Sequence, residues 1–194
     1  SNYDTSFEDY IDVEINGKCD IHIFDPTMTL KAAGHSIEEF EHFRRQLPPN
    51  YEFHNTGLCA PGENTMKIHG NVLNCTTIRQ ALRDNGHFDD GIDVMKFDVE
   101  GFEFGVLEST NWDELKIGLI LFEFHSKFVE RIISRRYTLM NLHHHFDRLE
   151  SAGYRLYSME PVCSGCTGQF EVAFIHAEWH PRYGFSKPCV SDSR

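Results

Sequence analysis

Short apolar segments that suit β-strands alternate with helical patterns along most of the chain, and this alternation constrains the fold more than any other feature. Strands are expected at residues 19–25, 51–58, 92–99, 117–124, 154–159 and 170–176. Helical stripes separate most of them, as in a mostly parallel sheet covered by helices. The last two strands are joined by a loop without a helix, so they are expected to form an antiparallel hairpin at one edge. We predict an α/β domain over residues 1–180, followed by a tail at 181–194.

Three helix starts carry a capping-box pair, in which a hydroxyl residue is followed three positions later by Glu or Gln. These pairs are Thr5 with Glu8, Ser36 with Glu39, and Thr77 with Gln80. The polar stretch before Thr77 contains Gly and Pro, and it is expected to be a loop. Gly153 is expected to end a long helix over residues 139–149.

Polar, mostly acidic side chains stand where three of the expected strands end. They are Asp25, Asp98 with Glu100, and Glu123 with His125. Because ligands of open parallel sheets bind beyond the carboxyl ends of the strands, these positions are the candidate site. Asp25 suits the ribose hydroxyls of a nucleotide, or alternatively a turn before Pro26.

Asp98 and Glu100 point to the same side of an extended segment, because strand side chains alternate. Together they are able to bind a cation, to ligate a metal or to act as a base. In the alternative, Asp98 caps the helix after Gly101 and Glu100 is solvated. His125 suits proton removal near neutral pH, or alternatively is a structural histidine bonded to a backbone carbonyl.

The segment Lys96-Phe97-Asp98-Val99-Glu100-Gly101-Phe102-Glu103 resembles the K-x-D-x-E-G-x-E signature of FkbM-type methyltransferases. Residues 22–26, 55–58 and 122–125 are similar to other segments of that family, in the same order. The likeness runs from about residue 1 to about residue 176. It implies a Rossmann-like class I methyltransferase fold, S-adenosylmethionine as cofactor, and methyl transfer, usually to oxygen.

The resemblance also assigns roles. Asp25 would hold the ribose, Gly57 and Leu58 would lie near the adenine, and Asp98 would lie by the methionine end. Asp98, Glu100 and His125 are the candidate catalytic residues, for substrate orientation and proton removal. The expected acceptor is a carbohydrate or another small-molecule hydroxyl.

The family's first strand and its Gly-containing cofactor loop precede the first helix, whereas this sequence starts at Ser1-Asn2-Tyr3-Asp4. These residues are similar to the tail of that loop, which implies cofactor contacts from Ser1 and Asn2. We expect the first strand upstream of residue 1, lying between residues 19–25 and 92–99. The alternative function is a non-catalytic domain that serves as a binding or structural module in an extracellular assembly.

Charge and cysteine content limit partners and compartment. A net charge of -12, from 30 acidic and 18 basic residues, argues against binding to nucleic-acid phosphates. The apolar runs are too short to span a membrane. Asn74-Cys75-Thr76 is an N-glycosylation sequon, and with six cysteines it favours the secretory pathway over the cytoplasm. Cys163 and Cys166 suggest a disulfide or two thiols rather than zinc, and no metal site is predicted.

Overall fold

The computed structural model describes residues 4–14, 19–30, 34–68, 70–99, 102–125, 139–163, 169–180 and 184–185. It divides into two compact units, Ser1–Thr76 and Thr77–Arg194. Each unit contains both helices and strands, so the chain has a mixed α/β architecture. Among the described residues, no helix is long and apolar enough to cross a membrane.

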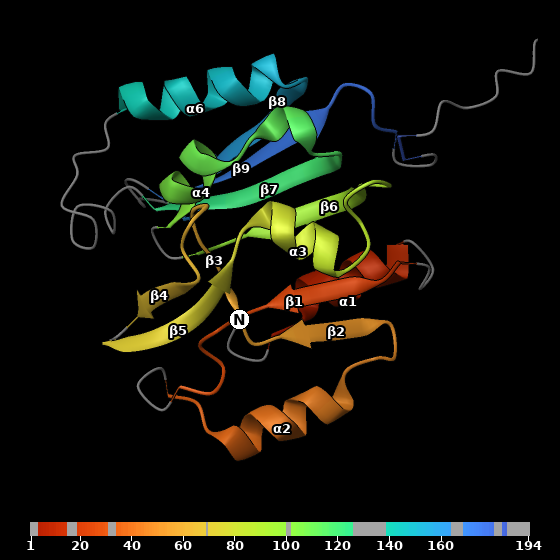
Figure 1. Ribbon diagram of the computed structural model, residues 1–194. Coiled ribbons are helices and arrows are strands. Elements are labelled where there is room, and N and C mark those ends of the chain that lie inside the picture. Colours follow the sequence, from red (N-terminus) through yellow and green to blue (C-terminus); the bar gives the residue numbers. More distant parts are fainter. Residues whose placement is uncertain are drawn as a thin grey trace, which may run out of the picture. The chain divides into compact units, whose positions relative to one another are not determined.

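The first unit contains two small sheets (Figure 1). In order, its elements are α1 (Ser6–Glu14), β1 (Ile21–Phe24), α2 (Ile37–Gln46), β2 (Tyr51–His54), β3 (Gly57–Leu58), β4 (Thr65–Ile68) and β5 (Asn71–Thr76). Strands β1 and β2 are parallel. In the second sheet, β5 lies between β3 and β4, parallel to β3 and antiparallel to β4.

Strands β1 and β2 bury one face beside α2. Ile23, Met28, Phe40, Tyr51 and Phe53 form this core. Phe40 of α2 meets Phe53 of β2 edge to face, with ring centroids 4.9 Å apart. Burying each such side chain contributes roughly 1.5 to 3 kcal/mol, so this contact holds α2 against the strands.

Capping at α2 and α3 (Ile78–Asp84) follows the sequence signals. Ser36 and Glu39 form the complete capping box at α2, each side chain bonding to the other residue's backbone amide. Thr77 caps α3 by accepting the backbone N–H of Gln80 at 3.1 Å. Gln80 itself donates to Asp84 one turn later, at 2.7 Å.

The prediction of a loop before Thr77 is wrong, because β4 and β5 form a hairpin there. Gly70 at its turn has φ 78°, a conformation that glycine adopts without strain. Met66 and Cys75 are buried, and a disulfide joins Cys75 to Cys59 with Cα atoms 5.7 Å apart. Thr65 to Ile68 does alternate polar and apolar residues, but the run is only four residues long and lies in a polar stretch with Gly and Pro, which favoured a loop.

The second unit holds a four-stranded sheet in the order β6-β7-β9-β8 (Figure 1). Besides α3, its elements are β6 (Ile92–Phe97), α4 (Glu103–Ser109), the 3-10 helix η2 (Trp112–Glu114), β7 (Ile117–His125), α6 (Leu139–Ser151), β8 (Tyr154–Pro161) and β9 (Gln169–His176). Strands β6 and β7 are parallel, whereas β9 is antiparallel to both β7 and β8.

The expected edge hairpin is therefore confirmed as β8 and β9. The described strand pairs are three parallel and three antiparallel, so the sheets are mixed rather than mostly parallel. The strand expected between residues 19–25 and 92–99 concerns the relation between the two units, and it stays a prediction.

Aromatic rings form the core of the second unit. Phe122 in the centre of β7 stacks on Phe97 of β6 at 5.2 Å and on Phe174 of β9 at 6.2 Å, between ring centroids. Phe146 of α6 packs edge to face on Phe174. This rigid centre fixes the residues that follow β6 and end β7.

Candidate active site

The ends of β6 and β7 bring acidic residues together in the second unit. The two strands are parallel neighbours, and Phe97 pairs with Phe122. Asp98 therefore stands beside Glu123, and His125 ends β7 two residues further on. The sequence expectation that the acidic ends of these two strands lie close together is confirmed.

His125 is held from one side by a buried carboxylate. Its Nδ1 atom lies 3.1 Å from Oε1 of Glu103, in the first turn of α4. The His125 side chain is 3% exposed and that of Glu103 is 0% exposed. An ionised carboxylate only accepts hydrogen bonds, so this contact places a proton on Nδ1. Glu103 also accepts the backbone N–H of Val99 at 3.2 Å, which ties the end of β6 to α4.

The other ring nitrogen of His125 faces two more carboxylates. Nε2 lies 3.3 Å from Oε1 of Glu123 and 3.8 Å from Oδ1 of Asp98. Asp98 is 41% exposed, so the site opens to solvent on its side. A proton or another positive charge at this position is attracted by both carboxylates. The arrangement suits the removal of a proton from a bound hydroxyl.

The same three residues form a donor set for a divalent cation. The ligand atoms of Asp98, Glu123 and His125 lie within 4.8 Å of one another. Glu103 behind the imidazole completes the carboxylate–histidine–metal arrangement that orients ligands in many metal sites. Nε2 would then be a ligand rather than a base.

The structure decides one of the alternatives drawn from the sequence. Position Phe102 is the N-cap of α4 and no side chain caps it, so Asp98 is not the helix cap. Nδ1 of His125 contacts the Glu103 carboxylate, an arrangement that suits a base and a structural histidine alike, so the role of His125 stays a prediction. Glu100, Ser1 and Asn2 lie outside the described residues, and their roles stay predictions.

Two members of the site were not assigned a role from the sequence. Glu103 was seen only as the last letter of the motif at residues 96–103, and Glu123 only as a strand-end carboxylate. The role of Glu103 becomes visible only in the structure, where α4 brings this residue beneath His125. For Glu123, the period-two spacing with His125 was the available sequence signal.

Asp25, directly after β1 in the first unit, makes the contacts of a turn residue. Its Oδ1 accepts the backbone N–H of Thr27 at 2.7 Å and the Thr27 hydroxyl at 2.6 Å. Burial raises the pKa of Asp25, but the net shift is downward, and the two hydrogen bonds from Thr27 contribute to lowering it. A charged acceptor at the end of β1 remains compatible with a ribose-binding role.

Gly57 and Leu58 form β3, paired with Cys75 and Thr76 of β5. A side chain at Gly57 would collide with the sulfur of Met66, and its Cβ would lie 3.0 Å from Cγ of Pro26. A larger residue at position 57 would displace the Met66 side chain and crowd Pro26, so glycine suits the approach of β3 to the turn after Asp25. The proposed contact of these residues with adenine stays a prediction.

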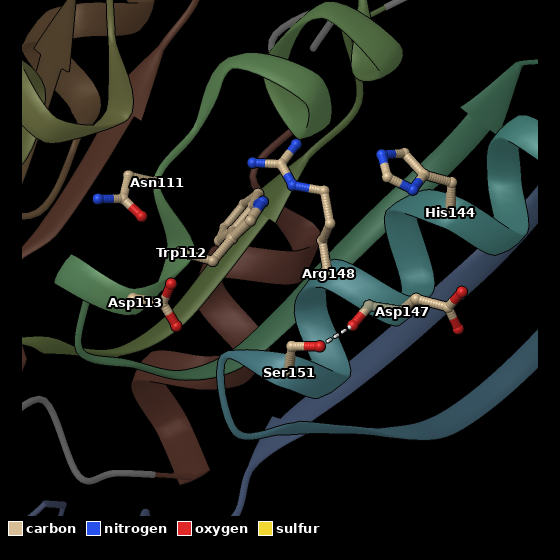
Figure 2. A pocket seen from close by; sticks show the side chains of 7 residues that line it. All are labelled: Asn111, Trp112, Asp113, His144, Asp147, Arg148 and Ser151. Atoms are coloured by element: carbon tan, nitrogen blue, oxygen red, sulfur yellow. Dashed lines mark hydrogen bonds between the residues drawn. The ribbon is translucent and has the colours of Figure 1, made fainter.

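A hollow on the second unit is lined by residues of η2, its N-cap and α6 (Figure 2). It is lined by Asn111, Trp112, Asp113, His144, Asp147, Arg148 and Ser151. The Arg148 guanidinium donates to the carbonyls of Leu107, Glu108 and Thr110 at 2.7 to 2.9 Å, so it caps the end of α4. These contacts give the lining a structural role.

Two comparisons agree on the class of protein. A family model described as "Methyltransferase FkbM domain" matches residues 16–156. A rat (Rattus norvegicus) protein described as "Probable methyltransferase-like protein 24" is 30% identical over 114 residues, which is 57% of this chain and 27% of that protein. The match thus covers little more than a quarter of the relative's length.

Proposed function

Because the chain belongs to the FkbM methyltransferase family, as the motif at residues 96–103 predicted, we propose that it transfers a methyl group from S-adenosylmethionine to a hydroxyl group. The proposed acceptor is a carbohydrate or another small molecule. The observation that carries this proposal is His125, held by Glu103 with Nε2 turned toward Asp98 and Glu123.

The described residues fit the proposed cofactor. S-adenosylmethionine supplies an electrophilic methyl group on a positively charged sulfur. The carboxylates of Asp98 and Glu123 favour positive charge beside them. In the first unit, Asp25 is kept ionised by Thr27 and is suited to accept hydrogen bonds from ribose hydroxyls.

His125 is the proposed base. Its Nε2 takes the proton of the acceptor hydroxyl while the acceptor oxygen forms its bond to the methyl carbon. The bond from that carbon to sulfur breaks, and neutral S-adenosylhomocysteine is released. Glu103 stabilises the imidazolium and keeps the ring in place, because it is buried and bonded to Nδ1. Asp98, the most exposed member, is proposed to position the acceptor hydroxyl.

Calorimetric titration with S-adenosylmethionine tests the proposal. We expect saturable binding, followed by S-adenosylhomocysteine formation when a glycan or small-molecule acceptor panel is added. Absence of binding would favour a non-catalytic module. If His125 is the base, turnover should persist in a chelator, whereas loss of turnover would assign Nε2 to a divalent cation.

We also propose that the protein matures in the secretory pathway. Cys59 and Cys75 are joined by a disulfide, and Cys163 is disulfide-bonded as well. Such bonds persist in oxidising compartments and are rare in the cytosol. Asn74 is exposed on β5, where an oligosaccharide can be attached.

A further inference from the structure

The first unit carries a second cluster of metal-ligand side chains, on the face of β1 and β2 that points away from α2. Parallel pairing sets His22 opposite Glu52, and Phe24 opposite His54. Side chains alternate along a strand, so Ile23 and Phe53 enter the core with α2, and their neighbours lie on the opposite face. Two histidines and one carboxylate meet there, although 32 residues separate His22 from His54.

The three ligand atoms are spaced as metal ligands are. Nδ1 of His22 lies 3.0 Å from Nε2 of His54 and 3.8 Å from Oε2 of Glu52. All three ligand atoms lie within 4.8 Å of one another. In a tetrahedral zinc site with bonds of about 2.0 to 2.2 Å, neighbouring ligand atoms are roughly 3.3 to 3.5 Å apart. One observed distance is shorter than that range and the other is longer, so small side-chain rotations would bring both into it.

Neighbouring rings hold His54 in position. Its ring stacks on Phe24 with centroids 4.3 Å apart and planes 13° apart, and on the ring of His22 at 5.3 Å. Glu52 is 65% exposed, which leaves the cluster open to ions from solvent.

We propose that His22, Glu52 and His54 bind one first-row transition-metal ion, with zinc as the expected occupant. Two imidazoles and one carboxylate suit zinc, whereas magnesium and calcium prefer oxygen ligands. Three protein ligands leave a fourth position for water. The ion would join β1 to β2, and it would share no ligand with the cluster of Asp98, Glu123 and His125.

Equilibrium dialysis of the full chain against zinc, with bound metal measured by mass spectrometry, tests the site. The wild-type chain is expected to bind one zinc ion at this site. The variants His22→Gln and His54→Gln are each expected to bind one zinc ion fewer. Cobalt in place of zinc should give a visible absorption band with the wild-type chain that is absent from both variants. Glu52→Gln should weaken zinc binding by at least the roughly 10-fold to 100-fold known for residues that only support metal ligands, because Glu52 is itself a proposed ligand.

Two controls separate this site from other histidines. His143→Gln changes an exposed histidine of α6 that contacts Asp147, and it should bind zinc as the wild type does. His125→Gln should still bind the zinc ion assigned to His22, Glu52 and His54. The proposal is overturned if wild type binds no zinc, or if the double variant His22→Gln/His54→Gln binds as much as wild type. Should that double variant fail to fold, unchanged zinc affinity in Glu52→Gln overturns it instead, because that side chain is mostly exposed.

Discussion

Nδ1 of His125 lies 3.1 Å from the carboxylate of Glu103, and both side chains are buried. A charged acceptor behind a buried imidazole fixes which ring nitrogen carries the proton, and so which nitrogen faces the ligands. The proposed chemistry at Asp98 and Glu123 depends on that orientation.

Glu103→Ala should destabilise the protein by about 1 to 3 kcal/mol, because the buried Nδ1 of His125 and the N–H of Val99 lose their acceptor. Glu103→Gln should cost less, since its amide oxygen is still able to accept a bond. Urea denaturation measures both. Glu108→Ala, at an exposed position of the same helix, is the matched control. Equal stability of Glu103→Ala and the control would contradict the role of Glu103.

Asp98→Asn should abolish methyl transfer and leave the fold intact, because it keeps the size of a half-exposed side chain and removes its charge. S-adenosylhomocysteine release and circular dichroism measure the two effects. Asp93→Asn changes another carboxylate of the same β6 segment, away from His125, and is expected to retain activity. Full activity in Asp98→Asn would show that the acidic cluster is not the reaction centre.

Asp25→Ala should weaken binding of S-adenosylmethionine by about tenfold or more, through loss of hydrogen bonds to a charged acceptor worth roughly 1.5 to 3 kcal/mol each. Calorimetry measures the affinity. Thr27→Val is the control for the turn, because it removes the hydroxyl bond to Asp25 and keeps the backbone N–H. If the two variants bind alike, Asp25 acts only through the turn.

Stability should fall in mild acid through His145, a buried residue of α6. Burial lowers its pKa, and the neighbouring His144 lowers it further, so the folded state holds the neutral form. The unfolded state, with a pKa of about 6.5, takes up the proton more readily, so the free energy of unfolding decreases as pH falls below that value.

His145→Gln should reduce this acid-dependent loss between about pH 7 and pH 5, as measured by urea denaturation at each pH. Burial also lowers the pKa values of His54 and His176. Their effect on the pH dependence of stability is the same in wild type and variant, so it cancels in the comparison. The same pH dependence in wild type and variant would count against a buried neutral His145.

Asn74 should carry a single glycan when the protein is expressed through the secretory pathway. Cys75 is the middle residue of the sequon and is joined to Cys59 by a disulfide. If that bond forms before glycosylation, it should hinder access to Asn74 and leave part of the protein unmodified. Mass spectrometry before and after glycosidase treatment measures occupancy. Cys59→Ser should raise occupancy, and Thr76→Ala should remove the glycan. An unmodified chain with reduced thiols would place the protein in the cytoplasm.

Local sequence signals determined much of the fold. The capping box at Ser36 and Glu39 marked the start of α2, because such bonds form between residues three apart. The apolar run of Ile117 to Phe122 marked β7, and the edge hairpin followed from the lack of a helix between its strands. The hairpin of β4 and β5 escaped notice although Thr65 to Ile68 alternates polar and apolar residues, because that run is short and lies in a polar stretch with Gly and Pro.

The candidate sites divide in the same way. Sequence alone determined that Asp98 and His125 stand at strand ends, since the alternation of strands and helices and the period of two are local properties. Only the tertiary structure decided that Glu103 is buried under His125 and that His22 meets His54. Those contacts depend on strand register and on the path of α4. Both are fixed by packing between residues far apart in the chain, which no local pattern encodes.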